Sequence, residues 1–311
     1  MKCYYHATDA DGWCCARQIW EQFGDGEFVT KDDFIGMDYT KPIDFSNVCR
    51  DEVVFILDYA CSVEGDREAI KNLYKNVTRN ITWIDHHEDS LIFDKENPDC
   101  NIYGYRVIND KYSAAMLLWI ELNMNNVSKE DLERGLVDTI AAPPAIQYIS
   151  DHDTFSHKLV DTLNSQAALK YYLDLGNYNI LTTDDMDVIS GVVSTGKLFR
   201  RRDEMDNRSY AKSNAFLIEV DGHKVYAMNK RCNSLGFSDL YYEADAVLPY
   251  YFTGDQWRYS LFANLKNPNH LNCGDIARLL GGGGREGAAG FSSKELLIKK
   301  NDNGYYLDLS K

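Results

Sequence analysis

Carboxylate and imidazole side chains gather in four short segments of the sequence. Their members are His6, Asp9, Asp11, Asp58, Asp85, His86, His87, Asp151 and Asp153. Such mixed oxygen and nitrogen donors suit manganese, iron or zinc. Without cations, so many carboxylates in one place would raise one another's pKa values. Because they exceed the needs of one metal, they favour a two-metal centre that activates a water for phosphoester cleavage, with Asp58 as the shared ligand.

The segments are far apart in the chain, so this chemistry depends on elements that bring them together. Three apolar runs, Lys2–Tyr5, Val53–Leu57 and Ile81–Ile84, each precede one polar segment. Runs of this kind are typical of parallel strands buried on both faces. Helices are expected between them, near Trp13–Phe23 and Glu64–Lys75, which gives a parallel α/β sheet. Ligands of such sheets bind beyond the carboxyl ends of the strands, where we expect the polar segments to converge.

The remaining sequence predicts a second domain. Further helices are expected over Ser113–Leu122 and from Ser128, and residues 147–153 supply the fourth acidic segment. A polar helical stretch then predicts a linker, which gives boundaries of 1–185 for the metal-binding domain, 186–213 for the linker and 214–311 for a smaller α/β domain. The predicted elements of that last domain are strands over Ala215–Val220, Lys224–Met228, Ala246–Phe252 and Trp257–Ala263, and a helix over Asp275–Leu280.

A glycine run stands near the end of the chain. Residues 281–284 are all glycine, Arg285 follows, and the small residues of 287–290 come next. A flexible hinge is the ordinary interpretation of such a run. Unhindered N–H groups beside an arginine can instead bind an anion, and we expect a phosphate-binding loop here.

Composition limits the substrate and the compartment. The 311 residues include 48 acids and 33 bases, a formal charge of −15, which favours small substrates over long nucleic acid. The eight cysteines contain no C-x-x-C pair, no apolar run is long enough to cross a membrane, and charge appears early at the N-terminus. We therefore expect a reduced cytoplasmic protein without a membrane partner.

In these motifs the sequence resembles the DHH phosphoesterase family with its associated C-terminal domain, the group of nanoRNase or oligoribonuclease-like and RecJ-related proteins. The motifs are His6-Ala-Thr-Asp9-Ala-Asp11-Gly12, Asp58, Asp85-His86-His87, Tyr148-Ile-Ser-Asp151-His-Asp153 and Gly281–Gly290. They follow the order and spacing of the family over nearly the whole chain.

The resemblance implies roles for these residues. One metal would be held by His6, Asp9 and Asp58, and the other by Asp11, Asp58, His86 and Asp151, with Asp153 as the competitor of Asp151. His87 would face the scissile phosphate as a contact or proton donor, and Asp85 would support it. Substrate-binding residues would be Gly282, Gly283, Gly284, Arg285, Ser234 and Asn229. Two Mn²⁺ ions are implied, with Mg²⁺ or Co²⁺ as substitutes.

The implied function is hydrolysis of short oligonucleotides or dinucleotides to nucleoside monophosphates. Alternatives are a cyclic-dinucleotide phosphodiesterase, a RecJ-like single-strand exonuclease, and an inactive nucleotide-binding sensor. The last rests on Arg285, because members of the family usually have histidine there, and arginine does not titrate near neutral pH. The oligomeric state stays open, with a homodimer included.

Overall fold

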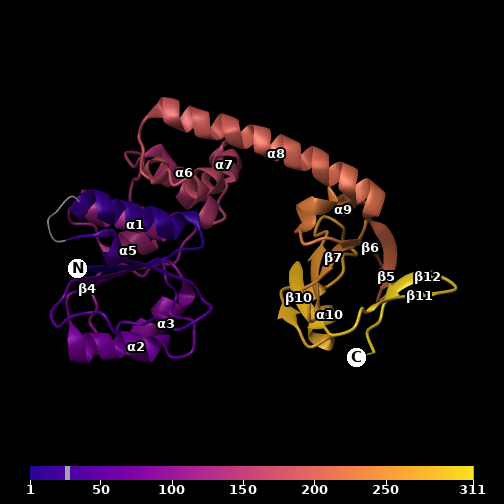
Figure 1. The fold of residues 1–311 in the computed structure, drawn as a ribbon, viewed down its shortest axis with the longest axis horizontal. Helices are drawn as coiled ribbons and strands as arrows, with labels where there is room; N and C mark the ends of the chain where they lie inside the picture. The colour runs from indigo at the N-terminus through magenta and orange to yellow at the C-terminus, as the bar shows by residue number, and fades with distance from the viewer. Residues whose placement is uncertain (25–28, 311) are drawn as a thin grey trace. The chain divides into compact units, whose positions relative to one another are not determined.

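The structure is a computed structural model that describes residues 1–24 and 29–310, and it divides into two units, Met1–Phe199 and Arg200–Lys311. Each unit has its own sheet and its own hydrophobic core, so the two are described separately (Figure 1).

The first unit is built on a parallel four-stranded sheet. Its strands β1 (Lys2–His6), β2 (Phe34–Met37), β3 (Val54–Leu57) and β4 (Ile81–Ile84) lie in the order β2-β1-β3-β4. The three predicted strands and the parallel α/β fold class are confirmed. The edge strand β2 was not predicted, because Gly36 interrupts its short apolar run and acidic residues precede it.

Helices cover both faces of this sheet. Alternate residues of β1 point to opposite faces, so Tyr5 enters one core and Tyr4 the other. The core around Tyr5 includes α1 (Ala10–Phe23) and α4 (Ala114–Asn123), and the core around Tyr4 includes α2 (Asp66–Asn72) and α3 (Glu88–Glu96). Figure 1 shows α1 on one side of the sheet and α2 and α3 on the other. The unit also contains α5 (Lys129–Glu133), α6 (Pro144–Asp153), α7 (Thr162–Asp174) and the short turns η1 (Lys31–Asp33), η2 (Leu73–Val77) and η3 (Tyr178–Leu181).

A single long helix, α8 (Met186–Asn214), occupies the stretch for which a helical linker was predicted. The second unit holds a mixed sheet in the order β11-β12-β5-β6-β7-β8-β10-β9. Its strands are β5 (Phe216–Val220), β6 (His223–Asn229), β7 (Ala246–Phe252), β8 (Trp257–Ala263), β9 (Gly283–Gly284), β10 (Ala288–Ser293), β11 (Ile298–Asn301) and β12 (Gly304–Leu307). Its helices are α9 (Leu240–Glu243), α10 (Cys273–Leu279) and the short turn η4 (Ser234–Phe237). The second α/β domain is thus confirmed, although its last four strands were not predicted.

The structure also bears on the state of the cysteines and on membrane-spanning helices. Each of the eight cysteines is free, and Cys14 and Cys15 are fully buried within α1. Among the residues that the structure describes, no helix combines the length and the apolar character that crossing a bilayer requires.

Candidate metal centre

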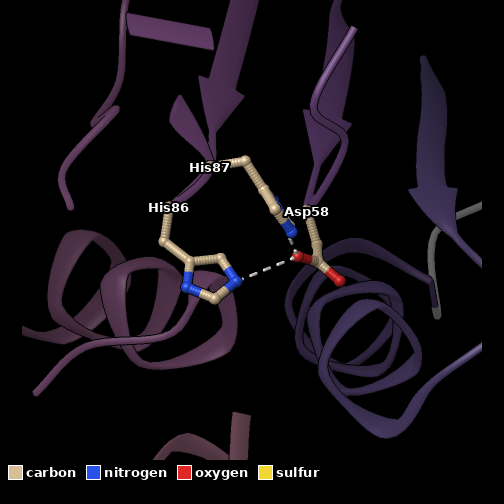
Figure 2. A group of neighbouring side chains, drawn as sticks. All are labelled: Asp58, His86 and His87. Carbon is tan, nitrogen blue, oxygen red and sulfur yellow. Dashed lines mark ion pairs between the residues drawn. The ribbon is translucent and has the colours of Figure 1, made fainter. Parts of the chain in front are cut away.

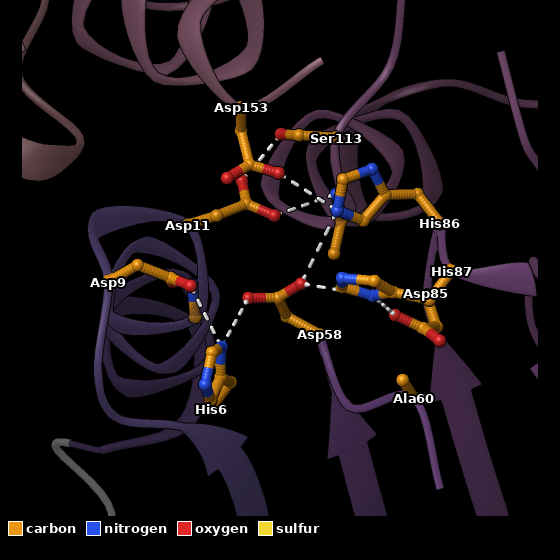
Figure 3. A network of polar contacts seen from close by, with 12 residues as sticks. His6, Asp9, Asp11, Asp58, Ala60, Asp85, His86, His87, Ser113 and Asp153 are labelled. Atoms are coloured by element: carbon orange, nitrogen blue, oxygen red, sulfur yellow. Dashed lines mark hydrogen bonds and ion pairs between the residues drawn. The ribbon is translucent and has the colours of Figure 1, made fainter. Parts of the chain in front are cut away.

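The parallel strands carry the first polar side chains of the centre at their carboxyl ends. His6 is the last residue of β1, Asp58 directly follows β3, and Asp85 directly follows β4. Parallel pairing aligns these three ends, so residues separated by about 80 positions meet at one edge. The predicted convergence is therefore present in the fold (Figure 3).

The first turn of α1 brings two more carboxylates to this edge. Asp9 caps the helix, because its side chain accepts a hydrogen bond from the backbone N–H of Gly12 at 3.1 Å. Gly12 is required by the close approach of α1 to β1, since a Cβ there would lie 1.9 Å from the carbonyl oxygen of His6. Asp11, one residue before it, is buried and points towards the start of α4.

Asp58 lies between two groups of ligand-type atoms. Its Oδ2 is 3.6 Å from His6 Nδ1 (Figure 3), and its Oδ1 is 3.6 Å from His86 Nε2 (Figures 2 and 3). Its side chain is buried, and its backbone has a φ of 53°, a left-handed conformation that non-glycine residues adopt at some cost. One oxygen therefore faces each group, which is the arrangement expected of a shared ligand.

The first group consists of His6, Asp9 and Asp58, whose ligand-type atoms lie within 4.8 Å of one another. His6 Nδ1 lies 2.8 Å from Asp9 Oδ2. The other ring nitrogen, Nε2, is 2.6 Å from the hydroxyl of Thr8, which fixes the plane of the ring. A histidine whose second nitrogen is held in this way presents the first in one direction.

The second group consists of Asp11, His86 and Asp153, and it contacts Asp58 through His86. His86 Nε2 lies 2.9 Å from Asp153 Oδ2. Asp11 is held by the backbone N–H groups of Ala114 and Ala115, at 2.9 and 3.1 Å, and by the hydroxyl of Ser113. These bonds place Asp11 at the N-terminus of α4, where a carboxylate is stabilised.

The structure places Asp153, and not Asp151, beside His86. Asp151 accepts hydrogen bonds from the backbone N–H groups of Lys158 and Leu159, at 2.8 and 3.1 Å, and from the hydroxyl of Thr162. Its carboxylate therefore orders the segment between α6 and α7. Within the described residues, the groups able to hold a metal ion include Asp153 and exclude Asp151.

Several buried polar atoms of the centre lack hydrogen bonds. They are His6 Nδ1, both carboxylate oxygens of Asp58, Asp85 Oδ2 and His86 Nε2. The Nδ1 of His6 and the Nε2 of His86 are close to carboxylate oxygens without the geometry of a hydrogen bond. Since buried polar groups are nearly always partnered, donor atoms that crowd together unpartnered fit divalent cations. No cysteine belongs to the groups found among the described residues, which accords with an oxygen-rich and nitrogen-rich site.

The pKa values of the side chains in the centre also fit a site for divalent cations. Burial lowers the pKa of His6, but the nearby carboxylates of Asp58 and Asp9 outweigh it and raise that pKa to about 10. Burial likewise opposes the charge of His86, while Asp153 and Asp58 raise its pKa to about 12. Burial raises the pKa of Asp11 well above its usual range, with further contributions from the charges of Asp58 and Asp153. In the absence of metal, bound protons thus offset the negative charge of these carboxylates. Divalent cations could replace those protons.

His87 is held differently from His86. Its Nδ1 lies 2.8 Å from Asp85 Oδ1, and its side chain is 40% exposed. Burial raises the pKa of Asp85, but the hydrogen bond and charge of His87, with the charge of His86, bring it below its usual value. An ionised carboxylate only accepts hydrogen bonds, so Nδ1 of His87 carries a proton. The bond therefore fixes the ring of a partly exposed histidine. The same Nδ1 lies 3.9 Å from Asp58 Oδ1, and His87 forms a third group of ligand-type atoms with Asp58 and His86 (Figure 2).

The predicted substrate-binding residues lie in the second unit and fall into two places. The glycine run is part of a hairpin and not a free loop, because Gly283 and Gly284 form β9 and pair with Gly290 and Ala289 of β10. A Cβ at residue 284 would lie 2.4 Å from the Cα of Ala289, so only glycine fits this pairing. Arg285 closes the turn through backbone bonds with Ala288 and is exposed.

Asn229 and Ser234 are separated from that hairpin. Asn229 ends β6, and Ser234 begins η4 directly after it. In the sheet, β6 and β9 are four strand positions apart, which corresponds to roughly 19 Å. The sheet order therefore gives two separate candidate contacts for a substrate.

No family model matches this chain, and no curated protein matches its sequence. Among solved structures, the pGpG-specific phosphodiesterase PggH from Vibrio cholerae superposes with a TM-score of 0.50 and 14% identity over 94% of each chain. The DHH domain of a member of the s1p family of ribosomal proteins gives a TM-score of 0.50 and 14% identity over 93% of this chain and 81% of that one. The exonuclease RecJ bound to manganese gives a TM-score of 0.43, which is too low to support an argument. At these identities the likeness concerns architecture, and the chain therefore has the fold of the DHH-domain proteins.

Proposed function

We propose that this protein is a metal-dependent phosphodiesterase that hydrolyses short oligonucleotides or linear dinucleotides to nucleoside monophosphates. The observation that carries the proposal is the position of Asp58, whose two unpartnered oxygens face two separate groups of ligand-type atoms. A carboxylate shared between two cations is the usual basis of phosphoester hydrolysis by metal pairs. The fold supports this, because one protein that shares it is named as a phosphodiesterase of the linear dinucleotide pGpG.

His6, Asp9 and Asp58 would hold one cation, and Asp11, Asp58, His86 and Asp153 the other. We propose manganese for both positions, since carboxylates outnumber imidazoles and no thiolate belongs to the groups formed by the described residues. Bound divalent cations at such a site lower the pKa of a water and neutralise charge on a phosphate.

The side chain that would move a proton is His87. Asp85 holds its Nδ1–H, so Nε2 is the nitrogen left for a substrate. Burial acts to lower the pKa of His87, but the bond and charge of Asp85 raise it above the ordinary histidine value. A protonated Nε2 can donate to a phosphate oxygen or to the leaving oxygen, which is the role of a general acid.

Arg285 and the glycine hairpin are proposed to bind the substrate. Among the described residues, no ion pair or hydrogen bond engages the guanidinium of Arg285, so it is available to a phosphate. The outer side of β9 is a sheet edge with N–H groups that no other described strand pairs. The net charge of −15 favours substrates with few phosphates, because long nucleic acid would meet overall repulsion.

The test is digestion of matched 5′-labelled RNAs, from two to about 24 nucleotides, with added manganese. Linear pGpG and cyclic di-AMP are assayed in parallel. We expect the shortest RNAs and the linear dinucleotide to be cleaved fastest, and EDTA and Asp58→Ala to abolish cleavage. Asp66→Asn is the matched control, because Asp66 is fully buried in the same unit and its carboxylate bonds, within the part of the chain that the structure describes, only to Ile43, Tyr59 and Val63.

Each other outcome would replace the proposal. Cleavage of the cyclic dinucleotide alone would assign a signalling phosphodiesterase, and preference for the longest strands would assign an exonuclease. Binding without cleavage, in protein shown to hold manganese, would assign a nucleotide sensor. Cleavage that is insensitive to Asp58→Ala would remove Asp58 from the chemistry altogether.

A further inference from the structure

A cavity lies in the first unit, apart from the ligand-type atoms of the metal centre. It has a volume of about 540 Å³ and is formed by β1, α1, β2 and the segment that enters η3. Sites for small molecules typically occupy about 300–1,000 Å³. None of the residues proposed to hold a metal lines it, so it requires its own explanation.

Five of the eleven residues that line the cavity are aromatic. Trp13 stacks on Tyr178 with ring centroids 4.9 Å apart, and Trp20 meets Phe34 edge to face at 5.5 Å. Tyr5 packs edge to face against Trp13 at 5.0 Å. Rings held rigidly by one another form a surface suited to stacking a planar ring, as in sites that bind nucleobases.

Two cations accompany these rings. Lys31, in η1, is exposed, and its ammonium group makes no ion pair or hydrogen bond within the described residues. Arg17 uses Nε to bind Glu21 at 2.8 Å, and no described residue accepts from its two terminal nitrogens. Cations beside an aromatic wall indicate a ligand that carries a negative group, such as a phosphate.

Polar atoms of the wall are also left without partners. Tyr5 is 6% exposed and lines the cavity, yet none of the described residues hydrogen-bonds to its hydroxyl. The indole N–H of Trp20 has no partner in the described part of the chain either, whereas that of Trp13 donates to the carbonyl of Ala7. The Tyr5 hydroxyl and the Trp20 N–H are therefore free to bond a ligand in the cavity.

We propose that this cavity binds a planar aromatic ring that bears an anionic group, with a nucleoside monophosphate as the fitting class. The ring stacks on the aromatic wall, Lys31 and Arg17 bind the anion, and the Tyr5 hydroxyl bonds the ligand. The inference rests on the cavity alone and goes beyond the proposed hydrolysis. The cavity shares two elements with the metal centre, because Tyr5 directly precedes His6 in β1 and α1 begins after Asp9.

The test is calorimetric titration of the full chain with AMP in EDTA, where no hydrolysis can contribute. Adenosine and ribose 5-phosphate are titrated separately, and both should bind at least about tenfold more weakly than AMP, since each lacks one half of the ligand. Lys31→Gln should weaken AMP binding about tenfold, and Tyr5→Phe about threefold or more. Lys75→Gln, an exposed lysine of η2 outside the cavity, is the matched control and should bind as the wild type does.

Binding at the glycine hairpin is the main rival, and Arg285→Ala separates the two. AMP binding that survives Arg285→Ala and weakens with Lys31→Gln and Tyr5→Phe supports the cavity. Binding that is lost with Arg285→Ala and unchanged by both cavity variants would overturn it, as would no binding of AMP at millimolar concentration. These outcomes are independent of the digestion assay, so either proposal can fail without the other.

Discussion

Asp58→Ala should remove nearly all of the stabilisation that manganese gives this protein. Asp58 belongs to both groups of ligand-type atoms, through Oδ2 to His6 and through Oδ1 to His86. Each cation at 100 times its dissociation constant stabilises the folded state by about 2.7 kcal/mol, so two give about 5 kcal/mol. For a unit of this size, each kcal/mol raises the melting temperature by about 2–4 °C, which predicts a rise of roughly 10–20 °C.

Substitution of a ligand that belongs to only one of the two groups should distinguish the two metal positions. His6→Ala removes a ligand of one group and Asp153→Ala a ligand of the other, so each should keep about half of the rise. Asp58→Ala should keep almost none. The assay is thermal unfolding of EDTA-treated protein across a manganese titration, with bound manganese counted at saturation.

A control isolates the effect of metal from that of folding. Asp66→Ala removes a buried aspartate that bonds only to protein groups, so it should lower the melting temperature without metal and keep the full rise with manganese. If Asp58→Ala keeps the full rise, or if both single-group variants lose it entirely, the shared-ligand arrangement is refuted.

Asp151→Ala should destabilise the protein but preserve the full rise in melting temperature with manganese, because its carboxylate bonds to the segment after α6 and not to the metal centre. Loss of that rise in the same melting assay would make Asp151 a metal ligand. Arg106→Met should lower the free energy of unfolding by about 3–5 kcal/mol in urea titrations, because this buried side chain bonds both oxygens of Asp94 at 3.0 and 3.1 Å; a change below about 1 kcal/mol would contradict that. Without metal, His6 has a folded-state pKa of about 10 against about 6.5 in the unfolded chain, so its contribution to stability is complete below pH 6.5 and is lost as pH rises through 10. Urea midpoints in EDTA should therefore fall over that window, and His6→Ala should reduce the fall.

The sequence alone determined three of the four strands of the first sheet and most of the side chains that meet at its edge. The runs at Lys2, Val53 and Ile81 are apolar because parallel strands are buried on both faces, and polar residues directly after such runs reach one edge. His6, Asp58 and His86 could therefore be grouped from their order in the chain. The strand β2 lacked this signal, since its four residues include Gly36 and become a strand only through pairing with β1.

Two other features, the strand of glycines and the aromatic cavity, depend on contacts that local sequence patterns do not predict. Gly283 and Gly284 have no strand preference of their own, and their pairing with β10 converts a predicted loop into a strand. The aromatic cavity likewise combines Tyr5, Trp20 and Tyr178, which no local pattern connects.

The choice between Asp151 and Asp153 shows most clearly what the sequence determined and what the tertiary structure decided. Both are acids of one motif, and nothing in their residue type distinguishes them. Two positions along a helix correspond to a rotation of about 200°, so the two carboxylates of α6 point in nearly opposite directions. Asp153 faces His86, and Asp151 faces the N–H groups of Lys158 and Leu159. The sequence thus determined which kinds of side chain meet at the sheet edge, and the rotation of one packed helix decided which acid joins them.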